Sequence, residues 1–183
     1  MTTSRLERCI AAAAALGLVA AGVVALSPLA GASSTGLRTH AACPNSDRRQ
    51  LTSGRAGSRS RLVPPGPREV LLCRYSGLDP SPRSAGRLVA QRLIGDRQTV
   101  ARLTRELGAL KSFPSGVFAC PADFGVKIIA IFRYLPTPRS DDPVTLDPSG
   151  CAGVTNGRLT RTAMFAPGRA LIGALEALTA AGP

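Results

Sequence analysis

The chain has 183 residues and a formal net charge of +12, with 23 Lys and Arg against 11 Asp and Glu. This length suits one domain of ordinary size, and the positive charge predicts salt-sensitive attraction to polyanions. The only histidine, His40, precedes the predicted globular part, so Ser–His and Cys–His catalysis within that part is excluded. No glycine-rich phosphate loop follows a predicted strand, and we expect no nucleotide or other cofactor.

The first 32 residues have the pattern of a secretory signal peptide. Arg5 and Arg8 precede an uncharged apolar run at residues 10–26, and Ala30-Gly31-Ala32 offers small side chains at the positions that a signal peptidase reads. We predict cleavage after Ala32 and a secreted mature protein. The alternative is an uncleaved segment that anchors the protein at the outer face of a membrane, its only expected contact with lipid.

Residues 33–61 are poor in large apolar side chains and rich in Ser, Thr, Gly and Arg. Such a segment buries too little apolar surface to offset its ordering entropy, so we predict a flexible basic linker. Its arginines, with one arginine beside each of two tyrosines further along, are candidate anion contacts: Arg48, Arg49, Arg55, Arg59, Arg61, Arg74 and Arg133. The expected anion is an envelope polymer and not nucleic acid; the alternative is a solvated arginine surface without a partner.

The folded domain is predicted to span residues 62–183. Residues 69–75 form the first predicted strand. Residues 87–94 suit either a short helix or a strand, and we favour a strand because Gly95-Asp96 separates them from a clearer helix at 97–110. That helix has Asp96 as its N-cap and an apolar stripe formed by Val100, Leu103, Leu107 and Leu110.

Residues 126–134 form the most strand-like run, and because the run is apolar on both alternating faces we predict a central strand. Prolines and aspartates then turn the chain into a short partner strand at 144–147, and Asn156-Gly157 predicts a second hairpin. An apolar stripe at 168–179 predicts a final helix. Clustered strands with segregated helices indicate an α+β fold, a mainly antiparallel sheet with two helices on one face and two disulfides.

Removal of the leader leaves four cysteines: Cys43, Cys73, Cys120 and Cys151. In an oxidising compartment they predict two disulfides, for which three pairings are formally open. The hairpin turn brings Cys120 and Cys151 to the same end of the sheet, provided that residues 121–125 form a loop. We predict the pairs Cys120–Cys151 and Cys43–Cys73. We expect the first to contribute more to stability, because the second would only tie down the linker.

Four aspartates lie on or beside the predicted hairpin: Asp123, Asp141, Asp142 and Asp147. They could supply a carboxylate pair for a hydrolase or oxygen ligands for calcium. No spaced acidic loop motif is present, however, and aspartates beside prolines are ordinary turn residues. We therefore expect no catalytic residue and no metal site.

Several short motifs carry a resemblance to a known group of proteins. They are Leu62-Val63-Pro64-Pro65-Gly66, Leu72-Cys73-Arg74-Tyr75-Ser76-Gly77-Leu78, Cys120-Pro121, Phe132-Arg133-Tyr134 and Gly150-Cys151 followed by Val154-Thr155-Asn156-Gly157. With these motifs, residues 62–161 resemble a family of small exported actinobacterial proteins to which no activity is assigned. This resemblance implies export and implies no mechanism.

The order of strand with cysteine, helix, Cys-Pro, hairpin and cysteine is more distantly similar to the secreted subtilisin-inhibitor family. That resemblance implies an inhibitory loop at Ala122, Asp123 and Phe124, in which Ala122 enters the protease pocket. The chain departs from the family's pattern because one cysteine on the helix side is missing, so that Cys43 would replace it. Asp123 would also stand directly after the scissile bond.

Taken together, these patterns favour a secreted, non-catalytic domain that binds an extracellular or cell-envelope partner, either a protein or an anionic polymer. The alternative is a protease inhibitor of the subtilisin-inhibitor type. A hydrolase that uses the aspartates is the least favoured class, because the required pairing has no sequence motif to support it.

Overall fold

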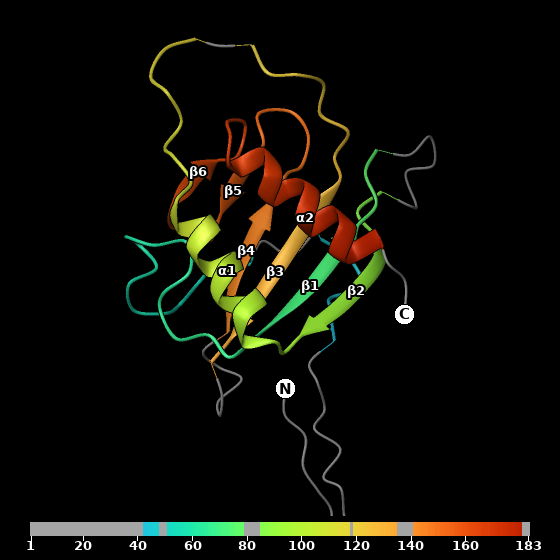
Figure 1. Cartoon of the computed structure of the whole chain (residues 1–183). Helices are drawn as coiled ribbons and strands as arrows, with labels where there is room; N and C mark the ends of the chain where they lie inside the picture. The colour runs from blue at the N-terminus through green and yellow to red at the C-terminus, as the bar shows by residue number, and fades with distance from the viewer. Residues whose placement is uncertain (1–41, 48–50, 79–84, 118, 135–140, 181–183) are drawn as a thin grey trace, which may run out of the picture. The chain divides into compact units, whose positions relative to one another are not determined.

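A computed structural model describes residues 42–47, 51–78, 85–117, 119–134 and 141–180. The predicted signal peptide with its cleavage after Ala32, and the candidate contacts Arg48 and Arg49, lie outside these residues. The elements are β1 (Glu69–Tyr75), β2 (Leu88–Ile94), α1 (Arg97–Gly108), β3 (Lys127–Arg133), β4 (Asp142–Leu146), β5 (Gly153–Thr155), β6 (Thr160–Thr162) and α2 (Gly168–Ala180) (Figure 1). The α+β class and the predicted order of elements are confirmed.

The six strands form one sheet in the order β2-β1-β3-β4-β5-β6, and every neighbouring pair is antiparallel. β3 lies inside the sheet between β1 and β4, as its two apolar faces predict. Residues 88–94 are a strand and not a helix, because they pair with β1 from Ile94 back to Leu88, with a bulge between Arg74 and Tyr75.

The larger hydrophobic cluster joins both helices to the sheet. Alternate residues of β1 and β3 contribute to it, together with the apolar stripes of α1 and α2: Val70, Leu72, Ile128, Phe132, Val100, Leu103, Leu107, Leu171 and Leu175. The carboxylate of Asp96 accepts a hydrogen bond from the backbone N–H of Thr99 at 2.8 Å, which confirms the predicted N-cap. The spacing of apolar residues therefore identified the face of each helix that packs against the sheet.

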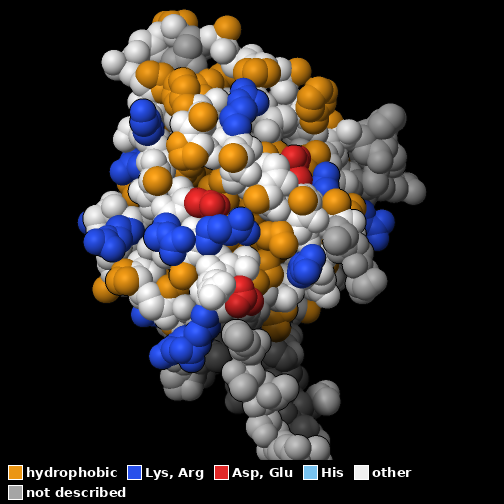
Figure 2. All heavy atoms as spheres, in the orientation of Figure 1, with side chains coloured by type: hydrophobic (Ala, Val, Ile, Leu, Met, Phe, Trp, Pro, Cys, Tyr) orange, Lys and Arg blue, Asp and Glu red, His pale blue; other side chains and the backbone are white. Residues whose placement is uncertain are grey.

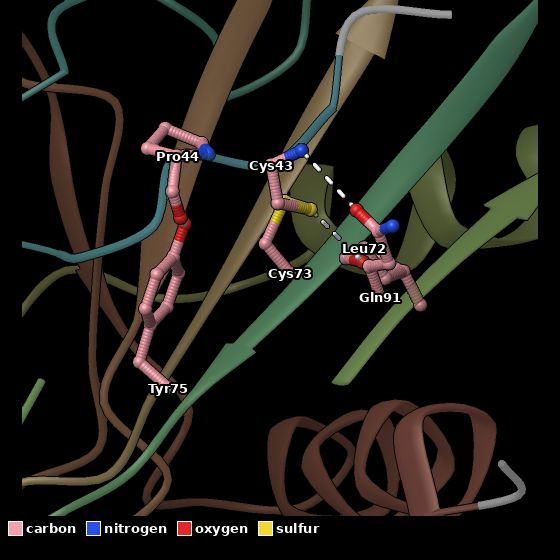
Figure 3. The surroundings of a disulfide bond; sticks show 6 residues. All are labelled: Cys43, Pro44, Leu72, Cys73, Tyr75 and Gln91. Carbon is pink, nitrogen blue, oxygen red and sulfur yellow. Dashed lines mark hydrogen bonds between the residues drawn. A yellow bond between two sulfur atoms is a disulfide. The ribbon is translucent and has the colours of Figure 1, made fainter. Parts of the chain in front are cut away.

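A second, smaller cluster is formed by the residues of β1 and β3 that point away from the first. Leu71, Cys73, Tyr75 and Ile129 pack there against Cys43. Cys43 and Cys73 form a disulfide with their Cα atoms 5.7 Å apart, and the N–H of Cys43 donates to the side chain of Gln91 (Figure 3). This bridge lies inside a core, so it does more than tie down a linker.

The second disulfide joins Cys120 to Cys151, with Cα atoms 4.9 Å apart, so both predicted pairings are confirmed. Residues 121–126 form no strand and run as a loop to the start of β3, as the pairing requires. Disulfides of this kind suit an oxidising, extracellular environment. Among the described residues, no helix has the length and apolar character needed to cross a membrane.

Residues 40–183 form one compact unit, which includes the described part of the predicted linker. We call the described residues from 42 to 62 the N-terminal segment. Ser53 and Ser58 of this segment are buried, although they belong to the predicted flexible linker. The side-chain amide of Asn156 donates to the carbonyls of Ser58 and Arg61 at 2.8 and 3.0 Å. The same amide nitrogen lies 3.2 Å from the carbonyl oxygen of Leu62. Hydrogen bonds and a disulfide hold the segment, together with the burial of Leu62 and Cys43 at its two ends.

Candidate functional site

The predicted inhibitory loop lies at one end of the sheet and projects into solvent. Residues 119–124, which we call the 119–124 loop, are exposed, and the side chain of Phe124 is 65% exposed. Figure 1 shows the segment between α1 and β3 standing out from the rest of the domain. The Cys120–Cys151 disulfide joins this loop to the turn between β4 and β5. Ala122, Asp123 and Phe124 are therefore accessible to a partner.

The loop is held on one side by the turn at residues 149–151. The hydroxyl of Ser149 donates to the Asp123 carboxylate at 2.7 Å and accepts from the N–H of Phe124 at 3.0 Å. The N–H of Gly150 donates to the carbonyl of Ala122 at 3.2 Å. Gly150 has a φ of +61°, and a Cβ on it would lie 3.2 Å from the Cβ of Asp123. The positive φ and the nearby Asp123 therefore favour glycine at this position.

Residues 76–78 hold the loop on its other side. The carbonyl of Phe124 accepts a hydrogen bond from the N–H of Leu78 at 2.7 Å. A Cβ on Gly77 would collide with the same carbonyl oxygen, so this position also requires a close backbone approach. The backbone around Phe124 is thus fixed from two directions while its ring stays exposed.

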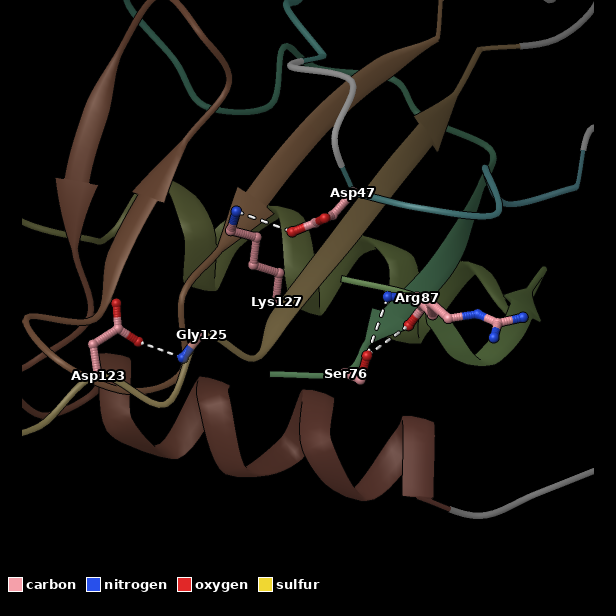
Figure 4. A network of polar contacts seen from close by, with 6 residues as sticks. All are labelled: Asp47, Ser76, Arg87, Asp123, Gly125 and Lys127. Atoms are coloured by element: carbon pink, nitrogen blue, oxygen red, sulfur yellow. Dashed lines mark hydrogen bonds and ion pairs between the residues drawn. The ribbon is translucent and has the colours of Figure 1, made fainter. Parts of the chain in front are cut away.

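Asp123 supports the loop from within. Its carboxylate accepts from the N–H of Gly125 at 2.8 Å as well as from Ser149. Hydrogen bonds from Gly125 and Ser149 hold the pKa of Asp123 below its usual range. Figure 4 shows this carboxylate turned toward Gly125. The ionised form of Asp123 therefore stabilises the turn that follows Phe124.

A hollow of about 330 Å³ lies between the 119–124 loop and α2. Pro121, Ala122 and Phe124 line one side, and Arg169 and Glu176 of α2 line another. The loop therefore offers a partner both a projecting aromatic ring and an adjoining recess that contains one positive and one negative side chain.

The four predicted aspartates do not meet in one place. Asp123 and Asp147 lie at the end of the sheet where β3 begins, near the ion pair between Lys127 and Asp47 at 3.0 Å (Figure 4). Burial raises the pKa of Asp147, and Lys127 acts in the opposite direction. Asp141 and Asp142 lie at the other end of β3. Because the two pairs lie at opposite ends of β3, the four carboxylates do not surround one ligand.

Asp142 is a buried carboxylate at that other end. It is 0% exposed, and burial raises its pKa, while the nearby Ser53 hydroxyl and Arg55 guanidinium lower it. Among the described residues, neither of its oxygens has a hydrogen bond of good geometry. The ionised form of Asp142 destabilises the fold in this position, whereas the protonated form does so much less.

Among the described candidate anion contacts, Arg55 and Arg133 are already engaged within the domain. Arg133 is 8% exposed and forms ion pairs with Glu69 at 2.9 Å and Asp141 at 3.7 Å. The guanidinium of Arg55 lies 3.5 Å from the centre of the Tyr134 ring. Arg59 and Arg61 are exposed and Arg74 is partly buried. An anion-binding role for the candidate arginines therefore stays a prediction.

The two tyrosines beside Arg74 and Arg133 have a role that the sequence did not indicate. The hydroxyl of Tyr75 donates to the carbonyl of Pro44 at 3.0 Å, and that of Tyr134 donates to Pro64 at 2.6 Å. Burial, together with the charge of Asp47, raises the pKa of Tyr75 to about 12. Tyr75 therefore anchors the N-terminal segment to the sheet, and Tyr134 anchors Pro64, which lies just after that segment.

Sequence reasoning also missed the residues that support the 119–124 loop, namely Ser149, Gly77 and Leu78. The motifs around Ser76-Gly77-Leu78 and Gly150-Cys151 contained the signal, but nothing in the sequence showed that they converge on one loop. No protein-family model, curated protein or solved structure matches the chain. Both resemblances consequently stay predictions.

Proposed function

We propose that the protein is a secreted, non-catalytic binding domain that presents the 119–124 loop to a protein partner in the extracellular space or cell envelope. In this proposal both helices cover one face of the sheet, so that the loop at the end of the sheet stays accessible. The observation that carries the proposal is that the loop is exposed yet held on both sides, by Ser149 and Gly150 and by Leu78.

A loop with this geometry loses little conformational entropy when it binds. Ordering a mobile loop weakens binding, and a loop that is already ordered avoids that cost. The exposed ring of Phe124 beside a hollow also has the character of a contact residue, since aromatic side chains dominate the binding energy of many interfaces. The partner is therefore expected to be a folded protein that contacts Phe124 and Ala122.

A capture experiment with two matched variants tests this proposal. Purified protein, Phe124→Ala and Val89→Ala are each used to capture partners from culture supernatant and cell-wall extract. Phe124 and Val89 are both exposed apolar residues, at 65% and 58%, but Val89 lies on β2 and does not line the hollow beside the loop. A protein retained by the wild type and Val89→Ala and lost with Phe124→Ala supports the proposal. A partner retained equally by both variants contradicts it.

A protease inhibitor of the subtilisin-inhibitor type is the second candidate, favoured by an exposed loop next to a disulfide. In that mode the carbonyl of Ala122 would have to enter the oxyanion hole of a protease. The same carbonyl accepts a hydrogen bond from Gly150 within the domain. That bond would have to break on binding, which makes inhibition the less favoured form of the proposal.

Inhibition assays against subtilisin-like and trypsin-like proteases separate the two candidates. An inhibitor should lose potency when Ala122 is changed to Gly and when Asp123 is changed to Arg. Full potency in both variants would contradict inhibition through this loop. Absence of inhibition by the wild-type protein, combined with capture that depends on Phe124, would support binding without inhibition.

A further inference from the structure

A basic hollow lies away from the 119–124 loop, between α1 and the turn before β1. It has a volume of about 520 Å³ and is lined by Arg68 and its neighbours in the turn, and by Arg97, Ala101, Thr104 and Arg105 of α1. An adjoining hollow of about 600 Å³ shares Arg97 and Arg105 and adds Arg102. Together the two hollows form one surface with four arginines, which we call the α1 basic surface.

Helical periodicity explains why these residues share a face. Arg97, Ala101 and Arg105 are spaced four residues apart, so their side chains lie above one another on α1. The buried residues Val100, Leu103 and Leu107 occupy the opposite stripe. The small side chain of Ala101 leaves space between the two arginines. The backbone positions of Arg97 and Arg105 are about 12 Å apart along the helix axis.

The turn that completes the surface is fixed to the sheet. Gly66 has a φ of +91°, which permits the bend between Pro65 and Pro67. The N–H of Arg68 donates to the carbonyl of Arg133 at 2.8 Å. Arg68 therefore approaches α1 from a backbone position that is held by β3.

The carboxylates of α1 and its N-cap are those of Glu106 and Asp96, and neither forms an ion pair with the arginines of this surface. Among the residues that the structure describes, no ion pair involves Arg68, Arg97, Arg102 or Arg105. Asp96 lines the second hollow, but its carboxylate accepts the capping hydrogen bond from Thr99, which lowers its pKa. Figure 2 shows several basic side chains, with acidic side chains beside them, over the part where Figure 1 shows α1. Four unpaired guanidinium groups create a positive potential that favours a bound anion.

We propose that the α1 basic surface binds a linear polymer with repeated phosphodiester groups, of the kind that an envelope glycan or polyol phosphate carries. Guanidinium groups match phosphate oxygens through paired hydrogen bonds. Arginines spread over about 12 Å of helix suit several phosphates in a row better than one small anion. None of the described residues lining the two hollows is aromatic, so the surface lacks the platform on which nucleic-acid bases stack.

The test measures binding of the full mature chain to linear inorganic polyphosphate over a range of salt concentrations. The site variant carries Arg97→Gln with Arg105→Gln. The matched control carries Arg59→Gln with Arg87→Gln, which removes the same charge from exposed positions elsewhere. The site variant should weaken binding at least about tenfold and lower the slope of log affinity against log salt by about 1.4, at about 0.7 per lost contact. The control should change both quantities much less.

Equal losses in the two variants would overturn the proposal, because attraction would then depend on net charge and not on this surface. Inorganic phosphate is then tested as a competitor at equal phosphate concentration. If it competes as well as the polymer, the surface does not require a ligand with repeated phosphate groups, which contradicts the proposal. Tighter binding of single-stranded DNA than of polyphosphate would contradict a ligand without bases. Phe124 does not line the α1 basic surface, so Phe124→Ala should bind polyphosphate like the wild type. A failure of the polyphosphate proposal would therefore not contradict the proposed function of the 119–124 loop. An unchanged melting temperature in the site variant confirms that the fold is intact.

Discussion

The 119–124 loop and the N-terminal segment are both irregular, and each is tied down by one disulfide. The N-terminal segment is joined to β1, and the loop is joined to the turn between β4 and β5. They differ in where their polar groups and side chains lie. In the N-terminal segment, buried Ser53 and Ser58 and the carbonyls held by Asn156 face the domain. In the 119–124 loop the backbone is held by Ser149 and Leu78, but the side chains face solvent. The first arrangement stabilises the fold, and the second preserves a surface for a partner.

The largest expected contrast concerns the two disulfides. Their loops span 30 and 31 residues, so the chain-entropy model gives each about 3–4 kcal/mol. Cys43 and Cys73 are also buried in the smaller core, whereas Cys120 is exposed. Contrary to the expectation from sequence, Cys43→Ala with Cys73→Ala should therefore lower the free energy of unfolding more than Cys120→Ala with Cys151→Ala. Denaturant unfolding of both double variants measures this order, and the opposite order would show that the smaller core contributes little.

Asn156→Ala should produce the next largest loss of stability. The Asn156 side chain donates to carbonyls of the N-terminal segment and accepts from the N–H groups of Arg158 and Leu159. Removing a buried side chain with these bonds should cost about 2–3 kcal/mol. Thermal unfolding should show the loss, and limited proteolysis should show faster cleavage in residues 51–61. Wild-type stability in this variant would contradict the anchoring role.

Asp142→Asn should change stability in a pH-dependent way. Burial raises the pKa of Asp142, so the folded protein retains the proton at pH values where the unfolded chain has lost it. The free energy of unfolding therefore falls as pH rises above the pKa of Asp142 in the unfolded chain. The whole loss is reached once the pH exceeds the pKa of Asp142 in the folded protein. The variant should gain about 1 kcal/mol at pH 8 and converge on the wild type near pH 3. A constant difference between pH 3 and pH 8 would contradict this account.

Ser149→Ala should have the smallest effect on stability. Its hydrogen bonds to Asp123 and Phe124 are exposed to solvent, so the free energy of unfolding should change by less than about 0.5 kcal/mol. Amide exchange at Phe124 should nevertheless become faster, because the bond from its N–H is removed. A large loss of stability without faster exchange would assign the 119–124 loop a structural role like that of the N-terminal segment.

The sequence predicted those features that depend on local patterns. The two apolar faces of β3, the stripe and N-cap of α1 and the Asn156-Gly157 hairpin are all readable within a few residues, and each is confirmed. The disulfide pairing also followed, because one hairpin turn determines which cysteines share an end of the sheet. In each case the decisive residues lie close together in the sequence or are related by a single turn.

The order of the N-terminal segment and the support of the 119–124 loop could not be predicted in this way. Asn156 reaches residues 58–62 across more than 90 positions of the chain, and Ser149 reaches Phe124 across 25. Composition correctly indicated that residues 51–61 bury little apolar surface, but it could not show which donors would meet their carbonyls. Such contacts arise only from the arrangement of the sheet.

Photo-crosslinking tests the contrast between the two regions most directly. A photoreactive residue is placed at Ala122 of the 119–124 loop or at Ala56 of the N-terminal segment; both positions are exposed. The variants are illuminated in culture supernatant and cell-wall extract, and adducts are identified by mass spectrometry. We predict a discrete protein adduct from position 122 and none from position 56. Adducts from position 56 alone would contradict the assignment of the 119–124 loop as the binding surface.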